Sequence, residues 1–586
     1  MTTLFRKAAA AALGAVTALS ALSCGPSLKD GEYSLTILST NDVHGSWFDS
    51  TYVGASVKPS LLAVNTYVDS VRAADGAGHV LLLDAGDCLQ GDNAAYYYNY
   101  VDTVSPHLFP RLLRYMGYDA VAWGNHDVET GHKVYDRVNR ELSGIGLPFM
   151  AGNALRNDNG KPYFPLYKMV EKGGLRIAIL GYNNANIKAW LAEEVWSGMH
   201  FERITDLVQA DVDLVRAKER PDVVVVVLHS ATGSGDGSNA EAEGLDVFNS
   251  VRGVDWVING HDHRPFVTVR DSMAMLNAGS HSRYLGHGKM RLTVRGGEIV
   301  SKELEADLIP VKAERVDTAM RAAFRKEFET VRSFTLREVG MLNVDMRTRD
   351  AYTGMSDYMN LIHSLCLGCA PARLSIAAPL TYNGFISSGV LVFNDLFTIY
   401  PFENQLYVIR MSGEEIVRYL EASYDRWINT YTPGGHVLKI IPRDNPRSFQ
   451  RGWSFADLTY NFDSVAGLWY TVDITRPRGE RIHISQMADG TPFSLAAEYN
   501  VAVTSYRASG GGALLDEIGI DTDRIDERVV ARYPEIRNIL YEYLEKNGSI
   551  DPEVIGNPAV VGGWKFVPEK LAGPALREDL ALVFGR

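Results

Sequence analysis

The sequence has little cysteine and no excess of basic charge. Four of its 586 residues are cysteine, and its net charge is -13. An acidic chain is not expected to bind nucleic acid, because a phosphate backbone attracts a basic surface. Cys366 and Cys369 form a Cys-x-x-Cys pair, for which a local disulfide and two structural thiols both stay open. A metal site at this pair is not expected, because no further ligands lie nearby in the sequence.

Long apolar runs are also lacking, apart from one at the N-terminus. This alanine-rich run, Ala8–Leu22, follows two basic residues and is shorter than the roughly 20 residues that span a bilayer. It predicts a secretory signal over residues 1–23. Cys24 follows in a context that resembles a bacterial lipobox, which predicts a lipid anchor with a tether over residues 24–32. Cleavage without lipidation is the alternative. The expected location is the cell envelope, in the periplasm or at the outer membrane.

The length predicts two domains, because 586 residues exceed what one hydrophobic core supports. In the first half, apolar runs of strand length alternate with helical patterns such as Leu61–Ala74, which is typical of an α/β fold with strands buried on both faces. The strand-like runs cover residues 33–40, 81–84, 119–123, 175–181, 222–228 and 254–259.

Five of these runs are followed by side chains that ligate metals. Ligands of α/β folds gather outside the carboxyl ends of the strands, so these side chains are expected to meet. They are oxygen and imidazole donors without thiolate, which suits zinc, manganese or iron, and their number suffices for two ions. The candidate ligands are Asp42, His44, Asp87, Asn125, His229, His261 and His263.

These motifs, in this order, resemble the calcineurin-like metallophosphoesterase superfamily, and within it the 5'-nucleotidase family. That family includes UDP-sugar hydrolases and 2',3'-cyclic-nucleotide phosphodiesterases. The resemblance implies a four-layer α/β/β/α sandwich over residues 33–310. The segment Ala313–Arg332 is charged and helical without strand signals, which predicts a linker helix over residues 311–335. The resemblance further implies an α+β substrate-binding domain over residues 336–560, followed by a C-terminal tail over residues 561–586.

The resemblance also implies roles for individual residues of the first domain. One divalent ion is expected on Asp42, His44, Asp87 and His263. The second is expected on Asp87, Asn125, His229 and His261, so that Asp87 is shared. His126 corresponds to the family's catalytic histidine. Glu129 stands where many relatives have an aspartate that orients this histidine.

In the second domain the resemblance assigns two aromatic rings, Phe402 and Tyr506, to stacking on a nucleobase; packing of both rings in the core is the alternative. Asn383 and Arg349 are further candidate substrate contacts. Two positions depart from the family pattern. Ser387 replaces an arginine that contacts phosphate, and Gly512 replaces an aspartate that binds the ribose hydroxyls, so nucleotide recognition is expected to be altered.

The sequence therefore predicts an exported phosphoesterase with two divalent metal ions, zinc, manganese or similar, that hydrolyses nucleoside monophosphates to nucleoside and phosphate. Hydrolysis of cyclic nucleotides or UDP-sugars is the alternative reaction. A surface lipoprotein that binds a ligand without turnover is an alternative of another class. The expected partners are a small nucleotide or phosphate ester and, through the anchor, a membrane; no protein partner is inferred.

Overall fold

A computed structural model describes residues 28–53, 56–442 and 452–585. The predicted signal segment and Cys24 lie outside these residues. The chain divides into two compact units. Unit 1 runs to Phe334 except for Ala189–Ala192, which belong with Thr335–Arg586 to unit 2. Within the described ranges, no helix combines the length and the apolar character needed to cross a membrane.

Unit 1 contains two six-stranded sheets. The order of the first sheet is β14 (Glu298–Pro310), β13 (Tyr284–Arg295), β1 (Gly31–Thr40), β2 (Val80–Asp84), β3 (Ala120–Ala122) and β4 (Phe149–Met150). The order of the second is β11 (Phe266–Arg270), β12 (Met273–Asn277), β10 (Trp256–Asn259), β9 (Val223–Leu228), β7 (Leu175–Tyr182) and β6 (Tyr167–Lys172). Each predicted strand run is confirmed as a strand.

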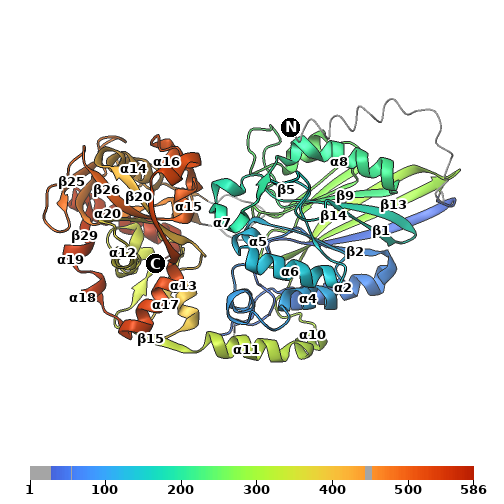
Figure 1. The fold of residues 1–586 in the computed structure, drawn as a ribbon, viewed down its shortest axis with the longest axis horizontal. Helices are drawn as coiled ribbons and strands as arrows, with labels where there is room; N and C mark the ends of the chain where they lie inside the picture. The colour runs from blue at the N-terminus through green and yellow to red at the C-terminus, as the bar shows by residue number, and fades with distance from the viewer. Residues whose placement is uncertain (1–27, 54–55, 443–451, 586) are drawn as a thin grey trace. The chain divides into compact units, whose positions relative to one another are not determined.

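The two sheets pack face to face through apolar side chains. Leu35 and Leu83 of the first sheet share one buried cluster with Ile177 and Val225 of the second. Alternate residues point to the outer faces, where Val224 of β9 packs against α8 (Ile204–Glu219). On the outer face of the first sheet lie α2 (Leu61–Asp75), α4 (Leu108–Met116) and α6 (His132–Gly144). Figure 1 shows α8 on one side of the sheets and these three helices on the other, so the predicted four-layer sandwich is confirmed.

The strands that carry the candidate ligands run in parallel. β1 pairs in parallel with β2 and β2 with β3, while β9 pairs in parallel with both β7 and β10. Their carboxyl ends therefore meet at one edge of each sheet, which is where the predicted polar motifs begin.

The segment predicted as a linker helix over residues 311–335 contains two helices, α10 (Thr318–Ala323) and α11 (Arg325–Thr335). Both lie in unit 1 up to Phe334, and Thr335 is the first residue of the second segment of unit 2. Helix α10 starts late because the Asp317 carboxylate caps it, accepting hydrogen bonds from Ala319 N at 2.8 Å and Met320 N at 3.0 Å. It ends at Phe324, whose ψ of 17° interrupts the helical backbone.

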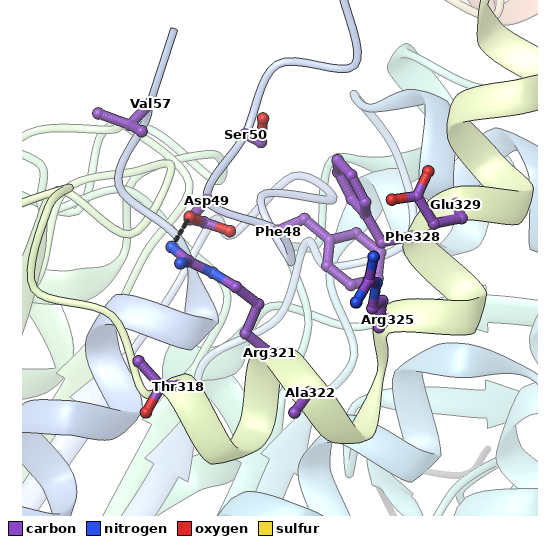
Figure 2. Close-up of a pocket in the computed structure, with 10 residues that line it drawn as sticks. All are labelled: Phe48, Asp49, Ser50, Val57, Thr318, Arg321, Ala322, Arg325, Phe328 and Glu329. Carbon is purple, nitrogen blue, oxygen red and sulfur yellow. Dashed lines mark hydrogen bonds and ion pairs between the residues drawn. The ribbon is translucent and has the colours of Figure 1, made fainter. Parts of the chain in front are cut away.

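Both helices line a pocket of about 510 Å³ in unit 1 (Figure 2). Phe328 packs edge to face against Phe48 with ring centroids 5.3 Å apart, and Arg321 pairs with Asp49. None of the seven candidate metal ligands lines this pocket.

Unit 2 is built around a five-stranded sheet of order β23-β17-β26-β20-β27. Its strands are β17 (Leu374–Ala377), β20 (Gln405–Ser412), β23 (Ser464–Ala466), β26 (Glu498–Thr504) and β27 (Val529–Glu535). Unit 2 also has two three-stranded sheets. The order of the first is β19 (Gly389–Val392), β15 (Glu338–Leu342) and β28 (Ser549–Ile550). The order of the second is β25 (Ile482–Met487), β24 (Leu468–Asp473) and β29 (Gly562–Val567). The longer helices are α12 (Asp357–Cys369), α14 (Gly413–Trp427), α17 (Ile536–Asn547) and α20 (Glu569–Phe584).

The residues predicted as a C-terminal tail are part of this unit. β29 pairs in parallel with β24, and α20 contributes Ala572 and Leu576 to the core of unit 2. Cys366 and Cys369, both on α12, are free thiols.

A buried histidine makes the stability of unit 2 sensitive to acid. His363 is 3% exposed, and its ring nitrogens lie 3.0 Å from Ser375 Oγ and 3.1 Å from Ser464 Oγ. Burial lowers the pKa of His363 to about 3. Between its unfolded pKa of about 6.5 and this value, only the unfolded chain takes up the proton, so stability falls as the pH falls.

We therefore expect the unfolding free energy of unit 2 to lose about 1.4 kcal/mol per pH unit through this residue below pH 6.5. Denaturant titrations between pH 4.5 and 6.5 measure the loss. His363→Gln removes the titrating group, so its stability is expected to fall less steeply. Equal slopes for the variant and the parent protein would contradict this assignment.

Candidate metal centre

Five of the seven candidate ligands have a left-handed backbone, which is strained for a residue with a side chain and is found at functional sites. Their φ values are 49° for Asp42, 47° for His44, 60° for Asp87, 80° for His261 and 56° for His263. At each of these positions the left-handed backbone changes the direction of the side chain shortly after the strand ends.

Three of the ligands form a first group. His44 Nε2 and His263 Nε2 are 2.9 Å apart, and they lie 3.9 Å and 3.4 Å from Asp42 Oδ1. Burial and the charge of His263 hold the pKa of His44 well below its usual value, so this imidazole keeps a lone pair. Two imidazole nitrogens and one carboxylate oxygen facing one another are suited to a divalent cation.

The second group is centred on His229, which is fully buried. Its Nδ1 lies 2.8 Å from Ala85 O, and a carbonyl oxygen only accepts, so Nδ1 carries the proton of the neutral ring. Its Nε2 then presents a lone pair 3.0 Å from Asn125 Oδ1 and 3.0 Å from Asp87 Oδ2.

His261 completes this group and is oriented by a residue that sequence reasoning missed. Its Nε2 lies 3.1 Å from Glu241 Oε1, and its Nδ1 lies 2.9 Å from Asn125 Oδ1. The Glu241 carboxylate accepts the Nε2 proton, which leaves the Nδ1 lone pair facing the group. Glu241 comes from the loop between β9 and α9 (Gly244–Ser250), and no pattern in the sequence marks it.

The buried Asp87 carboxylate favours a positive charge within the second group. Asp87 is 1% exposed, and its Oδ2 faces His229 Nε2 at 3.0 Å. Burial opposes a charge on His229, yet Asp87 outweighs it and raises the pKa of His229 to about 10. The space between the Asp87 carboxylate and the His229 imidazole thus suits one cation, either a proton or a metal ion.

The ligand atoms of each group lie within 4.8 Å of one another. The two groups are adjacent, because His261 N donates to Asp42 Oδ2 at 2.9 Å and His44 N donates to Asp87 O at 2.9 Å. The donor set of the two groups therefore fits two divalent ions at neighbouring positions.

His126 begins α5 (Asn125–Glu129) beside the second group. Its N donates to Asp87 Oδ1 at 2.8 Å, and its Nδ1 lies 2.6 Å from Glu129 Oε2. Burial opposes a positive charge, but Asp87 and Glu129 outweigh it and raise the pKa of His126 to about 9. The longer side chain of glutamate thus reaches the imidazole, and the other ring nitrogen is left for a ligand.

Asp127 joins the loops that carry Asp87 and Asn125. Its Oδ2 accepts from Asp87 N at 3.0 Å and Gly124 N at 2.9 Å, and its Oδ1 accepts from Cys88 N and Leu89 N at 2.9 Å each. It supports the turn before α5, and it also fixes the ligand loop that follows β2.

We expect Asp127→Asn to weaken metal binding by about 10- to 100-fold, because an amide NH₂ opposes two of the four backbone donors and releases the Asp87 loop. Competition with a chelator measures the affinity. The matched control is Asp255→Asn, a buried aspartate that accepts from Val224 N at 2.8 Å before β10 begins. This control is expected to lower stability without changing metal affinity, and equal losses in both variants would contradict the prediction.

The candidate substrate residues of unit 2 lie at its surface. Phe402 and Tyr506 are half-buried, Asn383 is exposed, and Arg349 is half-buried in the segment Thr348–Tyr352. Arg349 and Asn383 lie on neighbouring segments, because Gly384 N donates to Thr348 Oγ1 at 2.7 Å.

Arg347, near Arg349 and Asn383, is a further candidate substrate contact that sequence reasoning missed. β16 (Met346–Arg347) pairs with β18 (Phe385–Ile386), and the Arg347 guanidinium lies 4.7 Å from the centroid of the Phe385 ring. Only the strand register brings this cation beside the loop that contains Ser387.

The surrounding structure favours glycine at position 512. Its φ is 68°, and a Cβ there would lie 2.3 Å from Asn461 Oδ1 and 2.4 Å from Arg507 Nη1. A side chain at position 512 would therefore require the side chains of Asn461 and Arg507 to move, in addition to a left-handed backbone.

Two family models match the chain in the order of its two units. The calcineurin-like phosphoesterase model matches residues 35–265, and the model of the 5'-nucleotidase C-terminal domain matches residues 338–517. Together they span most of the described residues.

Three similar proteins agree with these matches. The trifunctional nucleotide phosphoesterase YfkN of Bacillus subtilis is 22% identical over 91% of this chain, which spans 39% of that protein. A 2',3'-cyclic-nucleotide 2'-phosphodiesterase/3'-nucleotidase of Haemophilus influenzae is 24% identical over 94% of this chain and 90% of its own. The crystal structure of a 5'-nucleotidase precursor of Thermus thermophilus shares the fold, with a TM-score of 0.59 and 20% identity over 92% of this chain and 100% of that one.

Proposed function

Because the chain belongs to the 5'-nucleotidase family of calcineurin-like phosphoesterases, and is thus a metal-dependent hydrolase of phosphate esters, we propose that it converts nucleoside monophosphates to nucleoside and phosphate. The observation that carries this proposal is the pair of adjacent ligand groups beside His126.

We propose that the first group and the second group each hold one divalent ion, with Asp87 shared between them. Such ions supply Lewis acidity and lower the pKa of a bound water. The chain itself supplies a hydrogen-bond donor at His126, whose imidazole is oriented through Nδ1 by Glu129. The opposite nitrogen then gives its proton to the leaving oxygen of the ester. Phe402 and Tyr506 of unit 2 bind the base by stacking.

A second candidate reaction is the hydrolysis of 2',3'-cyclic nucleotides. Gly512 supports it, because a site that lacks the ribose carboxylate does not depend on a free 2',3'-diol. The likeness to the cyclic-nucleotide phosphodiesterase of Haemophilus influenzae supports it as well.

A substrate panel tests both reactions. The protein is stripped with a chelator and reloaded with manganese or zinc, then given AMP, UMP, 2',3'-cyclic AMP, UDP-glucose and an aryl phosphate. Phosphate is measured with and without an added phosphatase. We expect release from AMP and UMP without the added enzyme. Release that always requires the added phosphatase would favour the phosphodiester reaction and contradict the monoesterase proposal.

We further propose that the protein is exported and anchored through acylated Cys24. The support is the N-terminal sequence pattern alone. Cys24→Ser is expected to move the protein from the membrane fraction to the soluble fraction, and mass spectrometry of the N-terminal peptide detects the lipid directly. A peptide that carries no lipid in the parent protein would contradict the anchor.

A further inference from the structure

Two fully buried arginines lie beside the loops that carry Phe402 and Tyr506. Arg537 is 1% exposed and Arg507 is 3% exposed. Burying a guanidinium is costly, and replacing a buried ion pair by apolar residues of similar volume is often neutral or stabilising. A contribution to stability is therefore a weak explanation for the presence of a buried arginine at either position.

Arg537, at the start of α17, holds both neighbours of Phe402. Its guanidinium forms an ion pair with Glu403, and its Nη1 donates to Pro401 O at 3.5 Å. The same guanidinium lies 3.9 Å from the ring centroid of Phe397. The guanidinium thus contacts the backbone of Pro401 before Phe402 and the carboxylate of Glu403 after it. Ile536 N adds a hydrogen bond to Asn404 O at 3.0 Å.

Arg507 holds the second ring in a similar way. It follows Tyr506 in the short helix α15 (Ser505–Ala508) and pairs with the buried carboxylate of Asp463 at 2.9 Å. It also donates to Tyr460 O at 2.9 Å and to Gly511 O at 2.5 Å. Its guanidinium carbon lies 5.5 Å from the centroid of the Tyr506 ring.

The two loops are joined directly. Gln405 N, three residues after Phe402, donates to Ser505 Oγ at 3.1 Å. The Tyr506 ring lies against the backbone of Gly511, where a Cβ would approach the ring to 2.5 Å. The two loops therefore form one connected support, with Arg507 against the Tyr506 ring and Arg537 bound to both chain neighbours of Phe402.

We propose that Arg537 and Arg507 are positioning residues that hold Phe402 and Tyr506 at a fixed spacing for a planar nucleobase. This inference rests on the proposed function, because it takes the two rings as the base site. It assigns the buried ion pairs to recognition of the base and gives them no part in the chemical step.

The test compares substrates with and without a base. KM and kcat are measured for AMP and for ribose 5-phosphate in the parent protein, Arg537→Met and Arg507→Met. Each variant is expected to raise KM for AMP about tenfold, a loss typical of weakened stacking, while kcat changes little. KM for ribose 5-phosphate is expected to stay the same. Arg537→Lys, which keeps the charge, is expected to recover part of the affinity for AMP.

The matched control is Arg481→Met. Arg481 is 3% exposed in the same unit and pairs with Asp425 at 3.1 Å, outside both ring loops. It is expected to lower the melting temperature without changing the ratio of the two KM values. If Arg537→Met does not fold, Glu403→Gln removes the same ion pair at nearly constant volume.

A direct binding measurement separates this inference from the proposed reaction. Adenosine, which has no phosphate, is titrated against each protein and its dissociation constant is compared. Weaker adenosine binding in both arginine variants, with the control unchanged, supports the inference even if no ester is hydrolysed. An unchanged dissociation constant, or equal KM changes for AMP and ribose 5-phosphate, overturns it. Absence of hydrolysis by the parent protein overturns the proposed function alone.

Discussion

Replacing Asp87 with asparagine is expected to lower kcat/KM by about 10³-fold. The carboxylate is buried, and its Oδ2 faces His229 Nε2 at 3.0 Å. Removing one partner of such a pair leaves the other uncompensated, which costs about 3 to 5 kcal/mol. An amide also lacks the charge that a shared metal ligand needs to hold two cations close together.

Metal content gives a readout that is independent of turnover. After dialysis against a defined metal buffer, elemental analysis is expected to find two ions per chain in the parent protein and at most one in Asp87→Asn. A variant that keeps both ions and full activity would contradict the shared role of Asp87.

Asp84→Asn is the matched control at the end of β2, three residues before Asp87. Burial raises the pKa of Asp84 to about 7, and its carboxyl accepts from Thr40 Oγ1 at 2.5 Å and Gly86 N at 2.8 Å. Near neutral pH this acid is partly protonated, so an amide of the same shape replaces it with little change. We expect this variant to keep both ions and most of the activity.

The sequence was sufficient to predict the strands of unit 1 and the positions at which they end. Buried strands have continuous apolar runs, and the run from Val223 to Leu228 is confirmed as β9, with His229 directly after it. A break within a helix is a weaker signal. The segment around Phe324 has helical composition throughout, and nothing in its sequence marks the backbone break that the structure has at Phe324.

The residues that orient the ligands were harder to predict, because their partners are backbone atoms or come from distant loops. Ala85 O fixes the tautomer of His229 and is invisible in any side-chain pattern. Glu241 reaches His261 from a loop 20 residues away, and Arg347 reaches Phe385 across a strand pair 38 residues apart. Sequence spacing predicts which side chains share a strand end, but the contacts behind them require the register of the whole fold.

Replacing His126 with glutamine is expected to lower kcat for AMP by about 10²- to 10⁴-fold, the range typical of a lost general acid. The alkoxide of a nucleoside is a poor leaving group and requires a proton. An aryl phosphate leaves as a more stable phenoxide, so the same variant is expected to lose much less activity on that substrate. The ratio of the two losses measures the proton donation that we assign to His126.

Glu129→Gln tests the orientation of that donor without removing it. The Glu129 carboxylate lies 2.6 Å from His126 Nδ1, and its charge contributes to the raised pKa of His126. An amide keeps the contact but removes the charge, so we expect a loss of about tenfold on AMP and a smaller loss on the aryl ester. Elemental analysis must find unchanged metal content in both variants. Equal losses on the two substrates would show that His126 acts on binding or metal retention, and would contradict its role as the proton donor.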